Sequence, residues 1–309
     1  MTSQTLPGLP GADADPGTRP AVRSLFGSLL GDDSAVRHAA PPDPSSATVG
    51  PGAGVTAGAL QRHRAGARAW YRDVRGAIHV PASSTDDVLA GLVATDHAVP
   101  LVLTADASGL GGLRQARNML LEDDRVELLA VHVGLPPDRT PAAGARALLE
   151  ALDFTAPARV DTGLVPGWHE ALDVLAADGA EDVALRLDAA APGEVAAFLR
   201  VAVDLDLTVH CSIGPDQAVT GDGEASVPGL GVINVLCGVR AALNGAEAPE
   251  VGTILGATTA APLTSAVRRM SDADAALVRA FLGSVACADP VSVVDDLVAL
   301  GLLDPREEG

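Results

Sequence analysis

The chain has 309 residues, of which 48% are hydrophobic, and 40 acidic against 21 basic side chains give it a formal net charge of −19. All of the basic side chains are arginine, because the sequence contains no lysine. This absence excludes chemistry through a lysine Schiff base and any phosphate-binding loop that requires a lysine. The acidic balance argues against a nucleic-acid partner, since phosphate contacts need a basic surface.

Cysteine usage and hydropathy indicate the class of protein. The three cysteines, Cys211, Cys237 and Cys287, are far apart and form no C-x-x-C pair, so we predict neither a disulfide framework nor a zinc knuckle. No apolar run approaches the ~18 residues of a membrane helix, and no signal-peptide pattern opens the sequence. We therefore expect a cytoplasmic protein without a membrane partner, and the sequence leaves a homo-oligomer open.

The first 55 residues differ in composition from the rest of the chain, because they hold a large share of the 22 prolines together with Gly, Ser and Asp. Such a segment buries too little apolar surface to offset its ordering entropy. We predict a disordered tail at residues 1–55, in which only 22–30 is able to dock or to form a helical turn. The domain is then residues 56–309, the length of a (β/α)₈ barrel of about 250 residues.

Strand-like and helix-like segments alternate through this domain, a pattern typical of a parallel sheet with helices outside it. We predict strands at 77–81, 99–106, 126–134, 159–165, 182–189 and 207–214, with weaker candidates at 251–256 and 283–288. We predict helices at 56–73, 86–94, 112–121, 142–152, 168–177, 192–203, 230–243, 271–282 and 291–303.

Alternation within the strands favours a TIM-like (β/α)₈ barrel. With the two weak candidates there are eight strands; without them an open doubly wound sheet is the alternative. Val183, Leu185 and Leu187 form an apolar side, whereas Arg186 and Asp188 lie on the other. Central strands of an open sheet are apolar on both faces. In a barrel, apolar residues face the outer helices and polar residues face inward.

This alternation predicts a set of inward polar side chains, most of them near the carboxyl ends of strands, where barrel enzymes place catalytic groups. From it we predict four catalytic residues: His132, Arg186, Asp188 and His210. We predict four substrate-binding residues: His79, Asp106, Ser212 and His169, the last of which follows the fourth strand beside Trp168. The remaining inward candidates are Thr104, Asp161 and Thr208.

Two mechanisms fit the set. His132 and His210 with Asp188, or alternatively with Asp106, have the ligand chemistry for a divalent metal cofactor. Alternatively, a histidine acts as the general base and Arg186 stabilises a developing oxyanion. The sequence has neither an H-x-H nor an H-E-x-x-H spacing, so both mechanisms stay open. The polar loop at 215–229 is long enough to act as a lid.

Three segments, at 185–214, 231–246 (GVINVLCGVRAALNGA) and 289–303, resemble a group of actinobacterial proteins with a barrel-like pattern and no assigned activity. In that group a histidine pair usually follows the glycine after the sixth strand. The corresponding stretch here is Gly214-Pro215-Asp216-Gln217, so the resemblance implies an altered site if that pair is functional.

Two functions therefore follow from the sequence. The first is a barrel enzyme acting on a small polar or anionic metabolite by acid/base or metal-assisted chemistry, with lyase, isomerase and hydrolase reactions all open. The second is a non-catalytic relative that kept the barrel as a binding or scaffold protein.

Overall fold

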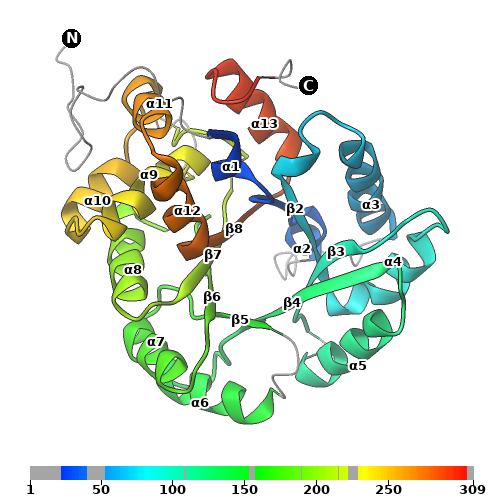
Figure 1. Cartoon of the computed structure of the whole chain (residues 1–309). Helices are drawn as coiled ribbons and strands as arrows, with labels where there is room; N and C mark the ends of the chain where they lie inside the picture. The colour runs from blue at the N-terminus through cyan, green and yellow to red at the C-terminus, as the bar shows by residue number, and fades with distance from the viewer. Residues whose placement is uncertain are drawn as a thin grey trace, which may run out of the picture.

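The structure is a computed structural model that describes residues 22–39, 53–107, 109–152, 157–188, 190–214, 216–221 and 229–304. Within these residues, eight parallel strands follow one another around a closed barrel, and the first pairs with both the second and the eighth (Figure 1). This confirms the predicted TIM-like barrel over the open sheet. The strands are β1 (Leu30–Asp32), β2 (Arg75–Pro81), β3 (Val99–Thr104), β4 (Val126–Gly134), β5 (Ala158–Asp161), β6 (Asp182–Arg186), β7 (Thr208–Ser212) and β8 (Leu282–Cys287).

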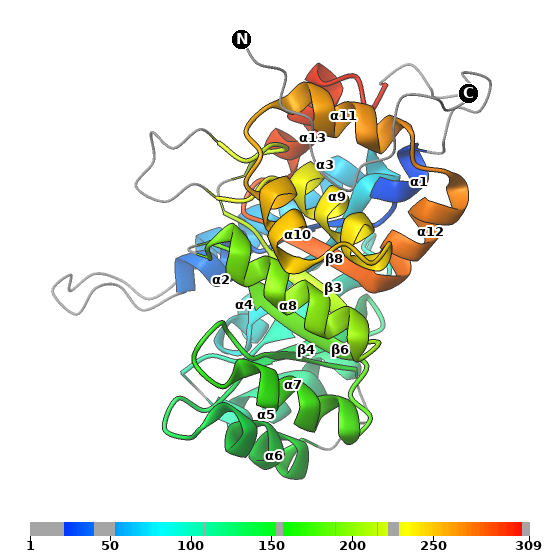
Figure 2. The same ribbon diagram turned by 90° about the vertical axis from the view of Figure 1, so that its left-hand side faces the viewer.

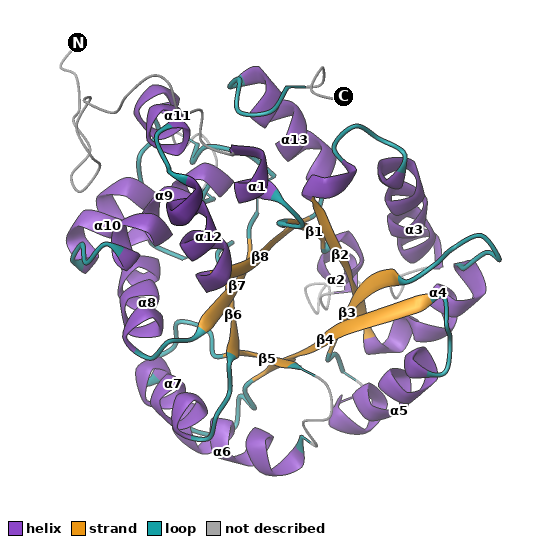
Figure 3. Cartoon of the chain, in the orientation of Figure 1, coloured by secondary structure: helices purple, strands orange, loops and turns teal. Residues whose placement is uncertain are grey.

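Helices form the outer ring (Figure 3), and the side view shows them stacked along the barrel wall (Figure 2). No helix in the described part of the chain is long and apolar enough to cross a membrane. The helices are α1 (Val22–Phe26), α2 (Ser34–Ala39), α3 (Ala53–Ala67), α4 (Thr85–Gly91), α5 (Gly109–Leu121), α6 (Pro141–Ala151), α7 (Trp168–Ala177), α8 (Pro192–Asp204), α9 (Val232–Leu243), α10 (Ala248–Leu255), α11 (Ala260–Arg268), α12 (Asp272–Phe281) and α13 (Pro290–Ala299), with short 3₁₀ turns at Arg72–Val74 and Ala82–Ser84.

The first barrel strand corrects the predicted domain boundary. β1 lies within the stretch expected to be a tail, and all three of its residues are buried. Arg62, on α3, donates from Nε to Oδ2 of Asp32 at 3.0 Å, which ties this strand to the outer layer. The domain therefore includes residues 22–39, and the rest of the expected tail, 1–21 and 40–52, lies outside the described residues. A three-residue strand among prolines and glycines carries too short a pattern to be recognised.

The weak strand candidate at 251–256 is wrong, because most of it lies in α10. Its apolar residues Val251, Ile254 and Leu255 share the helical spacing i, i+3, i+4 and are all buried. The total of eight strands is right only because β1 replaces this segment. The other weak candidate, 283–288, corresponds to β8.

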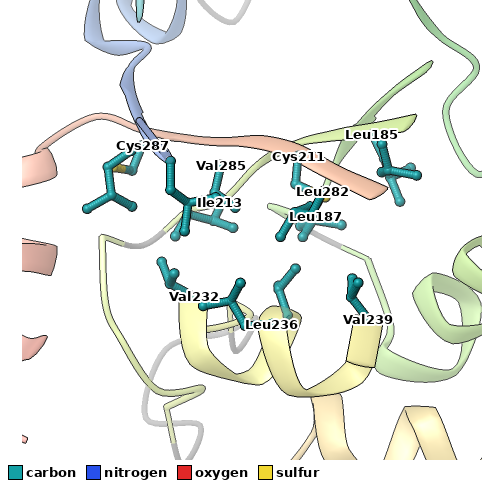
Figure 4. Packing of buried hydrophobic residues seen from close by; sticks show 14 of the residues in the cluster. Leu185, Leu187, Cys211, Ile213, Val232, Leu236, Val239, Leu282, Val285 and Cys287 are labelled. Carbon is teal, nitrogen blue, oxygen red and sulfur yellow. The ribbon is translucent and has the colours of Figure 1, made fainter. Parts of the chain in front are cut away.

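The apolar sides of the strands face the helices, as the alternation predicted. Figure 4 shows side chains from β6, β7 and β8 meeting the inner face of α9. α9 is buried over nearly its whole length, because α10, α11 and α12 cover its other side. The residues in this layer include Leu185, Leu187, Cys211, Ile213, Val232, Leu236, Val239, Leu282, Val285 and Cys287.

Polar residues occupy the alternate strand positions, whose side chains point into the barrel. In the strand register, His132 of β4 lies beside Thr104 of β3 and Arg159 of β5. His210 of β7 lies beside Ser284 of β8. The barrel interior therefore carries imidazole, guanidinium and hydroxyl groups.

Candidate functional site

A hydrogen-bonded group closes part of the barrel mouth, where the carboxyl ends of the strands meet. Asp33 follows β1, and its Oδ2 accepts a hydrogen bond from Oγ of Ser212, the last residue of β7, at 2.5 Å. Arg37 on α2 donates from Nε to Oδ1 of Asp33 at 2.7 Å and from Nη2 to the Ile213 carbonyl. Burial raises the pKa of Asp33, and the hydrogen bond from Arg37 opposes that rise.

Asp188 extends this group toward solvent. Its Oδ1 lies 3.5 Å from Nη1 of Arg37, and its Oδ2 accepts from Nη2 of Arg186 at 3.2 Å. The four charges therefore alternate in sign along the mouth. The Arg186 side chain is 57% exposed, compared with 21% for Arg37. Arg186 is thus the cation of this group with the most surface open to a ligand.

His132 lies beneath the mouth, with Nε2 at 3.9 Å from Oδ2 of Asp161. Burial, together with the charges of Arg159, His210 and Arg186, lowers the pKa of His132 to about 4. Burial raises the pKa of Asp161, although Oδ1 accepts from the Gly163 amide at 2.9 Å. At neutral pH, His132 is therefore an uncharged imidazole beside a carboxyl group.

The other two interior histidines have different surroundings. His210 contacts Oγ of Ser284 through Nδ1 at 2.8 Å and Oδ1 of Asp182 through Nε2 at 3.3 Å. The rings of His79 and His132 meet edge to face, with centroids 6.5 Å apart. Burial lowers the pKa of both His79 and His210, so these imidazoles are uncharged at neutral pH.

The predicted site therefore separates into two groups. Arg186, Asp188 and Ser212 share the network at the mouth. His132 lies below it, in ring contact with His79, whereas His210 contacts Ser284 and Asp182. Asp106, also at a strand's carboxyl end, accepts from the Ser83 amide at 2.7 Å.

His169 lies outside both groups. It is exposed in the first turn of α7, where its Nε2 lies 3.3 Å from Oε1 of Glu170 and its ring packs against Trp168. Of the loop at 215–229 expected to act as a lid, residues 215 and 222–228 lie outside the described residues.

The predicted metal ligands do not assemble. In the described part of the chain, no three His, Cys, Asp or Glu side chains form a group that could hold a metal ion. His210 is held by Ser284 and Asp182, whereas Asp188 is held by two arginines. The described residues thus give no assembled ligand set from His132, His210 and Asp188, and the metal site stays a prediction.

Several interior residues were not predicted. Asp33 and Arg37 were missed because they lie in the segment read as a tail. Arg159 has the same parity as Asp161, and Asp182 has the same parity as Arg186, so the alternation was sufficient to place both inside the barrel. The prediction favoured side chains in the carboxyl halves of the strands, whereas Arg159 and Asp182 lie near the starts of β5 and β6.

Comparison with protein-family models, curated proteins and solved structures finds no match to this chain. The resemblance to actinobacterial proteins stays a prediction.

Proposed function

We propose that the barrel catalyses proton transfer on a small anionic metabolite at its mouth, with Arg186 binding the anion and His132 acting as the general base. One observation carries the proposal: the exposed guanidinium of Arg186 belongs to the same strand-end region as a buried, uncharged imidazole that faces a carboxyl group. Barrel enzymes place their catalytic groups at this end.

Ligand binding would improve His132 as a base. The Arg186 charge is one of the causes that lower the His132 pKa. An anion bound to Arg186 offsets that charge, so the His132 pKa rises toward the range in which an imidazole exchanges protons efficiently. Asp161 then stabilises the imidazolium that forms. Proton abstraction of this kind is shared by lyases and isomerases.

Solvent deuterium exchange tests the proposal without knowledge of the final product. The purified protein is incubated in D₂O with a panel of small carboxylates and phosphate esters, and loss of carbon-bound protons is followed by NMR. We expect exchange on at least one compound, with a fall of about 100-fold or more in the exchange rate for His132→Gln. Arg186→Gln should mainly weaken binding. Arg146→Gln, which removes an exposed arginine on α6, is the matched control.

The ion-pair network supports a second candidate, a non-catalytic binding protein. Hydrogen bonds join Asp33 to Arg37 and Ser212, and Asp188 lies within ion-pair distance of Arg37, so the mouth is held together without a substrate. In this case a panel compound binds, Arg186→Gln weakens that binding, and no exchange occurs in any variant. Absence of both binding and exchange across the panel would rule out both candidates.

A further inference from the structure

A cavity of about 380 Å³ opens at the end of the barrel opposite the mouth. Its lining comes from the starts of several strands, including Arg75 on β2, Glu127 on β4, Arg159 on β5 and Gly283 on β8. Glu127 is exposed at the rim. His79 and Ser284, which are 6% and 9% exposed, lie at the buried end. The cavity therefore reaches from solvent into the barrel interior.

Arg159 is a buried cation without a bonded partner. The residue is only 9% exposed, and its Nε makes no hydrogen bond. Within the described ranges Arg159 has no ion pair either. The described carboxylate that acts favourably on it is Asp182, which contacts His210 instead. Burial lowers the Arg159 pKa to about 10, so the group stays charged at neutral pH. A buried charge normally needs a partner.

The rest of the lining leaves this charge uncompensated. Nε2 of His79 is buried and also lacks a hydrogen-bond partner among the described residues. Arg279 directs its guanidinium at the backbone carbonyls of Gly27, Leu282 and Gly283. Three arginines line the cavity against the single acidic side chain of Glu127. This is a local excess of positive charge in a protein whose net charge is −19.

We propose that this cavity binds a small oxyanion, the phosphate or carboxylate group of a small organic molecule, through the Arg159 guanidinium. A guanidinium offers a planar set of N–H donors that matches two oxygens of either group. The unpartnered Nε2 of His79 supplies a second polar contact near the buried end. The cavity opens at the end of the barrel opposite the mouth, although Arg159 lies beside His132 in the strand register. The proposal does not depend on the function proposed at the mouth.

Phosphate binding to the whole protein tests the site. Isothermal titration with inorganic phosphate and with acetate measures the affinity and shows which oxyanion is preferred. We expect Arg159→Met to weaken binding at least about tenfold, the loss expected for a charge-assisted hydrogen bond. Arg146→Met, which removes the same charge from an exposed position, should bind like the wild type. Without added anion, Arg159→Met should also raise the melting temperature, because it removes an uncompensated buried charge.

Phosphate also stabilises many proteins without binding to them, because it is excluded from their surface. The test therefore rests on the difference between the wild type and Arg159→Met. Equal binding by the wild type and Arg159→Met, or no binding of either anion to the wild type, would overturn the proposal. A lower melting temperature of Arg159→Met in the absence of anion would do the same. Should this variant not fold, Glu127→Gln gives an independent test at the exposed rim. It should tighten phosphate binding about threefold at low ionic strength, and unchanged affinity would count against the site.

Discussion

The imidazole of His210 occupies the space that a side chain at Gly283 would need. A Cβ placed on Gly283 would lie 2.7 Å from Nε2 and 2.8 Å from Nδ1 of the ring. The pairing of β7 with β8 shifts by one residue at this point, so that His210 lies beside Ser284. Absence of a side chain at 283 thus allows a buried imidazole to reach both Ser284 and Asp182.

Gly283→Ala should therefore destabilise the protein. The added methyl group displaces the His210 ring and strains its contacts, and overpacking of this kind costs about 2 kcal/mol. Urea denaturation at pH 7 measures the change in the free energy of unfolding. Gly134→Ala is the matched control, because a Cβ on this strand glycine would meet nothing within 4 Å. Equal effects of the two substitutions would contradict the assignment of the strain to His210.

Stability should fall as the pH is lowered from 7 to 5, in part because of His132. The unfolded chain takes up a proton on this imidazole near its ordinary pKa of 6.5, whereas the folded chain does so only near 4. Between these values the unfolded state binds more protons, so the free energy of unfolding decreases as pH falls. The contribution is absent above about pH 7 and amounts to roughly 2 kcal/mol at pH 5.

His132→Gln separates this contribution from the others. Asp33 and Asp161, whose pKa values are raised by burial, act in the opposite direction, because the folded chain then retains protons that the unfolded chain has released. Both carboxyl groups are present in the wild type and in His132→Gln, so comparison of the two proteins at each pH cancels their contribution. The drop in unfolding free energy between pH 7 and 5 should be smaller in His132→Gln by about 2 kcal/mol. The same drop in wild type and variant would contradict a low His132 pKa; the exposed His97→Gln is the control.

Asn234 links α9 by hydrogen bonds to α10 and to the loop that precedes α9. This residue is fully buried, and its Nδ2 donates to the carbonyls of Ile254 and Ala257 at 3.0 and 2.7 Å. Its Oδ1 accepts from the Thr220 amide at 2.9 Å. Asn234→Ala leaves several buried polar groups without partners, so we expect a loss of about 3 kcal/mol in unfolding free energy. Asn118→Ala on the exposed face of α5 should change it little, and a similarly small effect at Asn234 would refute the role assigned to it.

The alternation of polar and apolar residues was sufficient to predict the barrel and its inward face, because each strand has one side against helices. Val183, Leu185 and Leu187 show this directly, since all three are buried in the outer layer. The partners of the inward residues were not predictable. Whether His210 meets Asp188 or Asp182 depends on how β7 pairs with β6, where His210 lies beside Ala184, and no local pattern encodes that register.

The cavity could not be predicted from the sequence for the same reason. Arg159 alternates correctly with Asp161, but its importance depends on the lack of an ion-pair partner among the described residues, which is a property of the assembled interior. A sequence shows that a charge points inward; it does not show whether the charge is paired.

The buried segment at Leu25–Leu30 predicts the outcome of truncation. Leu25, Phe26, Leu29 and Leu30 are each at most 1% exposed, and their burial contributes about 8 kcal/mol at roughly 2 kcal/mol for each side chain. That is comparable to the whole stability of a typical domain, about 5–15 kcal/mol. A chain beginning at residue 53 also loses β1, which leaves the facing edges of β2 and β8 unpaired.

We therefore expect the 53–309 variant to lose its cooperative thermal transition and its near-ultraviolet circular dichroism, because specific packing around the barrel fails. A variant beginning at residue 22 retains every described element, so it should unfold cooperatively at a temperature close to that of the full chain. Circular dichroism of the three proteins side by side makes the comparison. A 53–309 variant that melts like the full chain would show that β1 is dispensable, and that the barrel closes without the strand on which the Asp33 side of the mouth depends.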